Sequence, residues 1–215
     1  MAYCFKQGAG VVPPPPLKHS REASYRDMRG LLPPRDDYPS RKAVFEVQTA
    51  DVGPVYMSVE RTPFRNAERC AVIVDSRKFL ELWRRDPYLT HAEVSNGNPD
   101  TWVQDYKYPE AEHGFSHGFA NPVPLAEVVC QTHVQRDAIW KRRYLFFREC
   151  VGVQESRFAY VAFSNGITRT IWLLVHGAEY FPVECDASGA EALARAAGYD
   201  GPEYQTVGTL TSRST

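Results

Sequence analysis

The stretch from Phe158 to Glu184 constrains the fold more tightly than any other part of this chain. It opens with an apolar, aromatic-rich run of strand length, and Ser164-Asn165-Gly166 then supplies residues that tolerate the backbone angles of a tight turn. Apolar residues at helical spacing follow, and Gly177 is a typical left-handed cap just past a helix end. The stretch therefore divides into a strand, a turn, a helix and a second strand, over residues 158–163, 164–166, 167–176 and 180–185.

The turn places Gly166 at the start of the predicted helix, where free backbone N–H groups and the helix dipole favour an anion. Gly166 has no side chain to obstruct a ligand, and the guanidinium of Arg169, one turn further on, can hold a phosphate with two hydrogen bonds. The same G-x-x-R spacing also fits a plain strand-to-helix connection in which Arg169 is a solvated surface charge. The candidate phosphate- or nucleotide-binding residues are Asn165, Gly166, Thr168 and Arg169.

Composition limits the classes of protein to which the chain can belong. Its 215 residues, 43% of them hydrophobic, are enough for one domain with a core. A formal net charge of −1 means that any contact with DNA requires a local basic patch. No apolar run is long enough to span a bilayer, and the five cysteines are widely spaced without a C-x-x-C pair. These features predict a cytoplasmic protein without membrane insertion, whose cysteines are reduced and lie mostly in core strands.

Two segments at the ends are predicted to lie outside the folded domain. Residues 1–42 are rich in proline, with Pro13–Pro16 in a row, and are expected to form a poorly ordered arm that contains polyproline II. Such an arm either docks on a partner or serves as a tether. Residues 199–215 are a polar tail, which leaves residues 43–198 as the folded domain.

The first half of this domain alternates apolar runs with turn residues. Asp75 follows a continuous apolar run, where it either caps the helix that Pro87 ends or serves as a metal ligand or general base; capping is the commoner role. Strands are expected over residues 44–47, 55–59 and 70–74, and a further helix over residues 189–197. This order of elements predicts an α/β (α+β) domain with one mixed sheet flanked by helices.

Two histidines and a carboxylate in the long segment before residue 120 form a candidate catalytic group. His113 and His117 are four residues apart, a spacing that on a helix would place both on one face, as metal ligands require. Gly114 and Gly118 favour a loop instead, in which this spacing fixes no geometry. Glu112 beside them suits a hard divalent ion such as Mg²⁺ or Mn²⁺. A loop packed by its aromatic residues explains the same sequence without a site.

The segment from Asp137 to Cys150 combines aromatic and basic residues. Its apolar residues recur at helical spacing, which predicts a helix with a basic face, although the aromatic content leaves a strand as an alternative. Lys141, Arg142 and Arg143 form the best local patch for a phosphate backbone. A solvated helix face fits these residues equally well.

The central stretch resembles the signature of the ParB/sulfiredoxin superfamily, in which a G-x-x-R box at a helix start binds nucleotide phosphate. Gly166 and Arg169 match the box, and Phe181-Pro-Val183 matches the strand after the helix. The resemblance implies a ParB/sulfiredoxin-like domain. Ile167 stands where sulfiredoxins have their reactive cysteine, so reductase chemistry is not expected. Thr168 stands where partitioning ParB proteins usually have a second basic residue.

A wider pattern over residues 43–198 is similar to the plasmid fertility inhibition factor family. The matching motifs are Arg61-Thr-Pro-Phe-Arg65, Gly114-Phe-Ser116 with Asn121-Pro-Val-Pro-Leu-Ala126, and Asn165–Leu173 with Phe181-Pro-Val-Glu184. The resemblance implies a protein encoded by a plasmid or integrative element that reduces conjugative transfer. Some relatives act at the coupling protein, and a related oncogenic suppressor with the ParB/sulfiredoxin fold is described as a DNase with ATPase activity.

Two hypotheses of different classes follow from this resemblance. In the first, the protein is a ParB-like nuclease or NTPase that holds a nucleoside triphosphate or single-stranded DNA at Gly166 and Arg169. Glu112 or Glu127 would position a water bound to Mg²⁺ or Mn²⁺, with His113 as a further catalytic candidate. In the second, the protein is a non-catalytic inhibitor that binds the conjugative coupling protein or the relaxosome.

Overall fold

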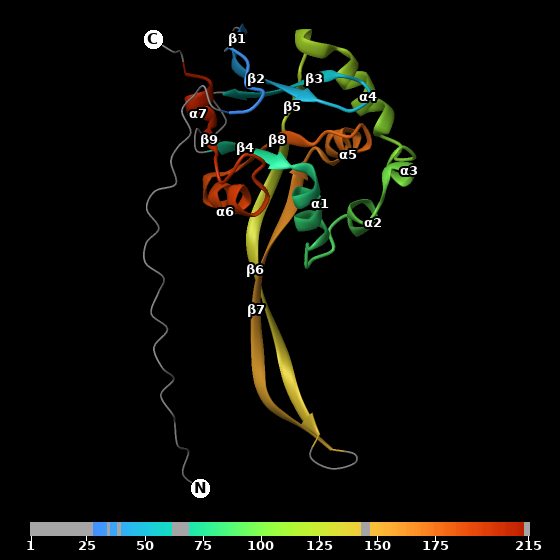
Figure 1. Cartoon of the computed structure of the whole chain (residues 1–215), viewed down its shortest axis with the longest axis vertical. Helices are drawn as coiled ribbons and strands as arrows, with labels where there is room; N and C mark the ends of the chain where they lie inside the picture. The colour runs from blue at the N-terminus through green and yellow to red at the C-terminus, as the bar shows by residue number, and fades with distance from the viewer. Residues whose placement is uncertain (1–27, 34, 38–39, 62–68, 143–146, 213–215) are drawn as a thin grey trace.

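A computed structural model describes residues 28–33, 35–37, 40–61, 69–142 and 147–212 of the chain. The proline run of the predicted arm, most of the Arg61–Arg65 motif and Arg143 lie outside the described residues. The chain forms an α/β structure with two mixed sheets (Figure 1). Among the described residues, no helix is long and apolar enough to cross a membrane.

The first sheet has the strand order β1-β2-β3-β5. Its strands are β1 (Arg35–Asp37), β2 (Ser40–Gln48), β3 (Pro54–Arg61) and β5 (Val123–Pro124). β2 and β3 form an antiparallel hairpin in which Phe45 opposes Met57, and β5 pairs parallel to β3. The predicted strands at residues 44–47 and 55–59 are confirmed within this hairpin.

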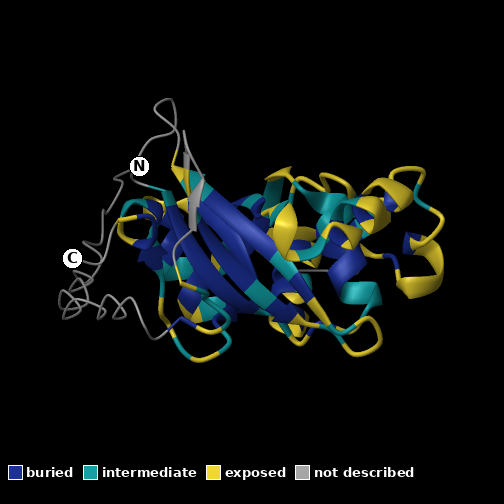
Figure 2. Cartoon of the chain, turned by 90° about the horizontal axis from the view of Figure 1, so that it is seen from above, coloured by how far each residue is buried: buried dark blue, intermediate teal, exposed yellow. Residues whose placement is uncertain are grey.

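The second sheet has the strand order β7-β6-β8-β4-β9, with β6 parallel to β8 and the other pairs antiparallel. Its strands are β4 (Arg69–Asp75), β6 (Ala126–Arg142), β7 (Arg148–Asn165), β8 (Tyr180–Asp186) and β9 (Gln205–Thr206). The predicted α/β class with mixed strand pairing is confirmed, but the strands form two sheets and not one. β3 pairs with β5, and β4 pairs with β8, so no backbone pairing joins the first sheet to the second. The apolar side chains of the two sheets instead pack together in one core. Figure 2 shows the buried strands across the middle of the body and the exposed residues mainly on helices and loops.

Seven α-helices and one short 3-10 helix, η1 (Gly118–Ala120), lie within the described residues. The α-helices are α1 (Ser76–Arg84), α2 (Ala92–Ser95), α3 (Pro99–Trp102), α4 (Tyr108–Ser116), α5 (Ile167–Val175), α6 (Ala187–Ala197) and α7 (Val207–Leu210). Asp75 caps α1, because its carboxylate accepts hydrogen bonds from the backbone N–H groups of Arg77 and Lys78, each at 3.0 Å. Phe79 and Trp83 then face the core. The structural role predicted for Asp75 is confirmed.

β6 and β7 extend beyond the body as a long two-stranded hairpin (Figure 1). We call its projecting part, residues 131–142 and 147–157, the arm; this hairpin arm is distinct from the proline-rich N-terminal segment discussed above. The helix predicted for the segment from Asp137 to Cys150 is wrong over its described residues, 137–142 and 148–150, because these pair across the hairpin, as in Ala138 with Val153 and Trp140 with Cys150. Long-range strand pairing overrides the helical spacing that the apolar residues show along the chain. The alternative of a strand is the correct one.

Segments on both sides of the predicted domain also pack on the body. Met28 is buried, and Leu31 forms a backbone bridge with Phe45 of β2. The predicted polar tail contains β9 and α7, and α7 buries Val207 and Leu210. Val207 and Leu210 complete the core at the β9 edge of the second sheet.

Three of the four described cysteines lie in core strands, as the sequence predicts. Cys70, Cys130 and Cys185 are free and buried in β4, β6 and β8, whereas Cys150 is free and exposed on the arm. Burial raises the pKa of the Cys130 thiol to about 11 and raises the pKa of Cys185 as well. These buried thiols are therefore neutral at physiological pH.

Candidate functional site

The turn between β7 and α5 has the geometry that the sequence predicts. β7 ends at Asn165, and Gly166 takes a left-handed conformation with φ of +94° at the N-cap of α5. A Cβ atom at position 166 would lie 2.8 Å from the Cα atom of Ala126 and 2.8 Å from Nε of Arg169. Glycine is required here for both its backbone angle and the close approach of its neighbours. At the other end of α5, Gly177 is also left-handed, as predicted.

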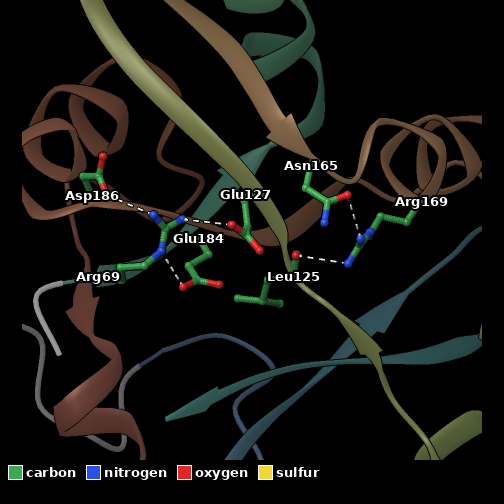
Figure 3. Close-up of polar contacts among 7 residues, drawn as sticks. All are labelled: Arg69, Leu125, Glu127, Asn165, Arg169, Glu184 and Asp186. Carbon is green, nitrogen blue, oxygen red and sulfur yellow. Dashed lines mark hydrogen bonds and ion pairs between the residues drawn. The ribbon is translucent and has the colours of Figure 1, made fainter. Parts of the chain in front are cut away.

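The Arg169 guanidinium binds the backbone of the segment that joins β5 to β6. Nη1 donates to the carbonyl oxygens of Pro124 at 2.6 Å and Leu125 at 3.2 Å, and Nη2 donates to Oδ1 of Asn165 at 3.4 Å (Figure 3). These bonds tie the first turn of α5 to the start of β6. Arg169 is therefore not a solvated surface charge, and its positive group is held in a defined place beside Gly166.

An open pocket of about 500 Å³ lies beside this turn. The end of β7 and the first turn of α5 form one wall, including Asn165, Gly166 and Thr168. Lys107, at the start of α4, and Arg169 place two cationic groups on the pocket, and Glu110 adds one carboxylate. The N-terminal end of the α5 dipole adds partial positive charge. The balance of these groups favours an anion with polar substituents.

The group of Glu112, His113 and His117 lies on or directly after α4, so the predicted loop was wrong. α4 forms because Tyr108, Ala111 and Phe115 bury one face; the ring of Phe115 stacks on that of Trp172 at 4.2 Å between centroids. Gly114 is tolerated within this helix because its neighbours bury the face beside it.

The rings of His113 and His117 lie edge to face, with centroids 4.6 Å apart, and both are exposed, as is Glu112. The pocket lining from α4 includes Glu110 and Gly114 but not these three residues. Within the described part of the chain, no group of three or more His, Cys, Asp and Glu side chains is placed to hold a metal ion. The structure therefore brings Asn165, Gly166, Thr168 and Arg169 together but leaves Glu112 and His113 outside the pocket lining.

Glu127, the third predicted catalytic residue, belongs to a cluster around Arg69. Nε of Arg69 lies 2.6 Å from Glu184, Nη1 lies 2.9 Å from Asp186, and Nη2 lies 3.9 Å from Glu127. Glu127 and Glu184 are neighbours in register on β6 and β8, and Glu184 is buried. Figure 3 shows this cluster and the Arg169 contacts on the two sides of the start of β6.

A guanidinium thus occupies the position among these carboxylates that a metal ion would need. The residues present do not fit a Mg²⁺ or Mn²⁺ site at Glu127. Sequence reasoning missed Arg69, since a basic residue at the start of an apolar strand gives no local sign of a buried partner on β8.

The predicted DNA-binding patch lies far from the pocket. Lys141 and Arg142 are exposed near the end of the arm, and Arg142 pairs directly with Arg148 across the hairpin. The strand from Glu127 to Arg142 spans roughly 50 Å at the usual rise per residue. A ligand in the pocket therefore does not contact this patch unless it is a long polymer.

Sequence reasoning also missed a polar contact at the C-terminal end of α5. Nε2 of His176 lies 3.2 Å from the hydroxyl oxygen of Tyr108, and Nδ1 lies 2.9 Å from Asp51. Burial, followed by the charges of Glu112 and Asp51, raises the pKa of Tyr108. These bonds connect α5 to α4 and to the turn between β2 and β3, so they fix the helix that carries Arg169 at its other end.

The fold of the chain is similar to that of a solved structure. The chain matches the crystal structure of Oncogenic Suppression Activity Protein, a plasmid fertility inhibition factor, in its gold(I) cyanide derivative. The TM-score is 0.55 with 23% sequence identity, and the match covers 79% of this chain and 76% of that one. At this identity the match shows a shared fold.

The sequence itself matches the model of the family Plasmid Fertility inhibition factor over residues 71–198. This range is more than half of the chain and contains α4, α5 and the pocket between them. The chain therefore belongs to the plasmid fertility inhibition factor family. A comparison with curated proteins found no match.

Proposed function

We propose that the protein reduces conjugative DNA transfer and that the pocket at the start of α5 binds a phosphate group of a nucleotide or of DNA. The family supports the biological role, and the pocket supports the chemistry. The observation that carries the proposal is the placement of Gly166, Thr168, Arg169 and Lys107 around one cavity of about 500 Å³.

Each of these residues has a physical role in the proposal. The left-handed Gly166 lets an anion approach the first N–H groups of α5, which have no partner within the helix. The Thr168 hydroxyl can donate a further hydrogen bond. Lys107 supplies a positive charge, whereas Arg169 donates hydrogen bonds to the carbonyl oxygens of Pro124 and Leu125 and so holds the turn in place beside the pocket.

Glu110 argues for a nucleotide over free phosphate. Its carboxylate lines the same pocket and can accept hydrogen bonds from the hydroxyl or amino groups of a nucleoside, which free phosphate lacks. The strand, turn and helix around Gly166 and Arg169 support a ParB/sulfiredoxin-like assignment of the domain. A nucleoside triphosphate or single-stranded DNA is the ligand class that we propose. At Glu127, the neighbouring carboxylates surround Arg69, so this cluster does not support a metal-assisted step.

A second candidate function is non-catalytic inhibition, in which the protein binds the conjugative coupling protein or the relaxosome. The specific observation in its favour is that the predicted catalytic residues do not line the pocket. Glu127 lies beside Arg69, and Glu112 and His113 lie outside the pocket lining. A bound nucleotide would then act as a structural ligand and not as a substrate.

Calorimetric titration with nucleoside triphosphates and with a single-stranded oligonucleotide tests the proposal. We expect wild type to bind, and we expect Lys107→Ala and Thr168→Val to weaken binding by roughly tenfold each, since each removes about one charged or neutral hydrogen bond. Arg195→Ala, which removes an exposed cation on α6, is the matched control and should bind as wild type does. Thermal melting checks that every variant is folded. Equal binding by all variants, or no binding by wild type, would contradict the proposal.

If nucleotide binds, assays for hydrolysis of nucleotide and of DNA with Mg²⁺ or Mn²⁺ separate the two candidates. Turnover that Glu127→Gln abolishes without loss of binding would favour an enzyme. Binding without turnover would favour the inhibitor.

A further inference from the structure

The arm presents an apolar face to solvent. Cross-strand partners share a face, so Ala138 and Val153 lie on the same side as Trp140 and Cys150. Trp140 is 60% exposed and Val153 is 61% exposed, and Val151 at the bulge beside them is exposed as well. The opposite face is mostly polar, with Gln135 and Gln154 among its residues. An isolated two-stranded hairpin is marginally stable in water, so this face is expected to be covered in the working protein.

The arm is also basic. Its described residues include five Lys or Arg side chains against three Asp or Glu side chains: Arg136, Lys141, Arg142, Arg148 and Arg157, and Asp137, Glu149 and Glu155. Glu155 bonds to both Arg136 and Arg157, but Arg142 and Arg148 oppose each other across the strands. Like charges directly opposite each other are unfavourable, and they suit an acidic partner. Two arms packed face to face would not satisfy them, because each arm carries the same excess of positive charge.

A surface of the body has the complementary character. Residues 99–112, which we call the α3–α4 surface, carry four acidic side chains and one lysine: Asp100, Asp105, Glu110, Glu112 and Lys107. Val103 and Tyr106 are exposed on the same segment, Tyr106 at 82%. The acidic, apolar character of this segment matches the basic, apolar face of the arm.

The arm does not reach this surface on its own body, because it projects away from α3 and α4 (Figure 1). It extends roughly 40 Å from the body at the usual strand rise. A compact body of this size is on the order of 40 Å across. The arm is therefore long enough to lie along the body of a second molecule.

We propose that two copies of the chain associate by exchanging arms, so that the arm of each copy packs its Trp140 face on the α3–α4 surface of the other. A two-fold arrangement makes both contacts at once and closes the assembly. Trp140 is the central anchor, and Arg142 and Arg148 at the rim face Asp100 and its neighbours. The proposal does not depend on a ligand in the α5 pocket.

Sedimentation of the full chain over a range of protein concentrations tests this proposal. We expect a dimer whose dissociation constant rises on the order of thirtyfold in Trp140→Ala, as is typical of an anchor residue. Val151→Ser with Val153→Ser should weaken the dimer, whereas Gln135→Ser with Gln154→Ser on the polar face of the arm should not.

Exchange of charges gives the sharpest test. One variant carries Arg142→Glu and Arg148→Glu on the arm, and a second carries Asp100→Lys, Gln104→Lys and Glu112→Lys on the body, which makes the α3–α4 surface net positive. Each variant alone should be monomeric because its arm and body have charges of the same sign. An equal mixture should recover a dimer, because each arm then meets a body of opposite charge.

Tryptophan emission adds an independent readout, since all four tryptophans are described and Trp83, Trp102 and Trp172 are buried. Iodide should quench Trp140 in dilute protein and lose access to it as the dimer forms. The proposal is overturned if the chain stays monomeric at all concentrations, or if the mixture of charge variants does not associate. It is equally overturned if the body variant still forms dimers, or if Trp140 is protected only when single-stranded DNA is added.

Discussion

β7 passes through two environments, and its two halves behave differently. From Phe158 onward it lies in the body, where Tyr160 and Val161 are buried and the strand leads directly into Gly166 and α5. Before Phe158 it forms one edge of the arm, with solvent on both faces. The body half contributes to the stability of the fold and to the candidate site. The arm half has only the neighbouring strand to hold it, so its side chains are available for an interface.

The largest contrast between the two regions concerns apolar packing. Phe181 is fully buried in β8, where its ring packs edge to face on Phe79. We expect Phe181→Ala to lower the free energy of unfolding by about 4 kcal/mol through loss of burial and creation of a cavity. Val153→Ala on the arm should change it by less than about 0.5 kcal/mol, since the side chain is exposed. Urea denaturation measures both, and comparable losses would show that the arm is part of the cooperative core.

Charged groups should show a similar contrast. Arg69→Met leaves the buried carboxylate of Glu184 without its closest partner, and we expect a loss of about 3 kcal/mol. Arg157→Met breaks an exposed pair with Glu155 and should leave stability unchanged within error. Thermal melts of the two variants give the comparison. If Arg69→Met is as stable as wild type, the cluster around Glu127 is not structural, and a catalytic role for it becomes the better explanation.

Substitutions of three glycines separate two costs of an added Cβ atom, which are strain in a left-handed backbone and contact with neighbouring atoms. Gly166→Ala meets Ala126 and Arg169 and also strains a left-handed backbone, so a loss of about 2–3 kcal/mol is expected. Gly53 has a similar left-handed φ of +84° with no atom within 4 Å, and Gly53→Ala should cost about 1 kcal/mol from strain alone. Gly152→Ala on the arm meets nothing closer than 3.9 Å and should cost nothing. A loss at Gly166 no greater than that at Gly53 would mean that the close approach there is unimportant.

The smallest expected effect is chemical and leaves stability unchanged. In a Cys4→Ser background, a thiol-alkylating reagent at pH 8 should label the exposed Cys150 and spare Cys130 and Cys185, whose buried thiols have raised pKa values. Mass spectrometry of the labelled, folded protein checks this, and labelling in denaturant gives the full count. Rapid labelling of Cys130 in the folded state would show that β6 opens within the body.

The same contrast explains which features could be predicted from the sequence. The strand, turn and helix from residue 158 to 177 were predicted because burial selects apolar residues at the period of each element, and because Gly166 and Gly177 mark positions that only glycine occupies easily. The cap at Asp75 was predicted for a similar local reason. The arm was not, since its structure depends on pairing between residues up to 29 positions apart, as in Gln131 with Tyr160.

The candidate site was predicted only in its local part. Asn165, Gly166, Thr168 and Arg169 lie within five consecutive residues and meet at one turn. Lys107 and Glu110 reach the same pocket from α4, some sixty residues away, and no local pattern connects them to Gly166. Gly114 and Gly118 suggested a loop at α4, and the burial of Phe115 against Trp172 outweighed their low helix propensity. Arg69 was missed because its partners lie on other strands of the sheet.

An NMR titration with a nucleoside triphosphate shows whether the start of α5 binds phosphate. Amide resonances in ¹⁵N-labelled protein identify which backbone N–H groups meet the ligand. We predict that the amides of Ile167, Thr168 and Arg169 shift first and most strongly, while those of Val151 and Val153 on the arm do not move. Saturable shifts confined to the arm, or no shifts at α5 at millimolar nucleotide, would contradict the account.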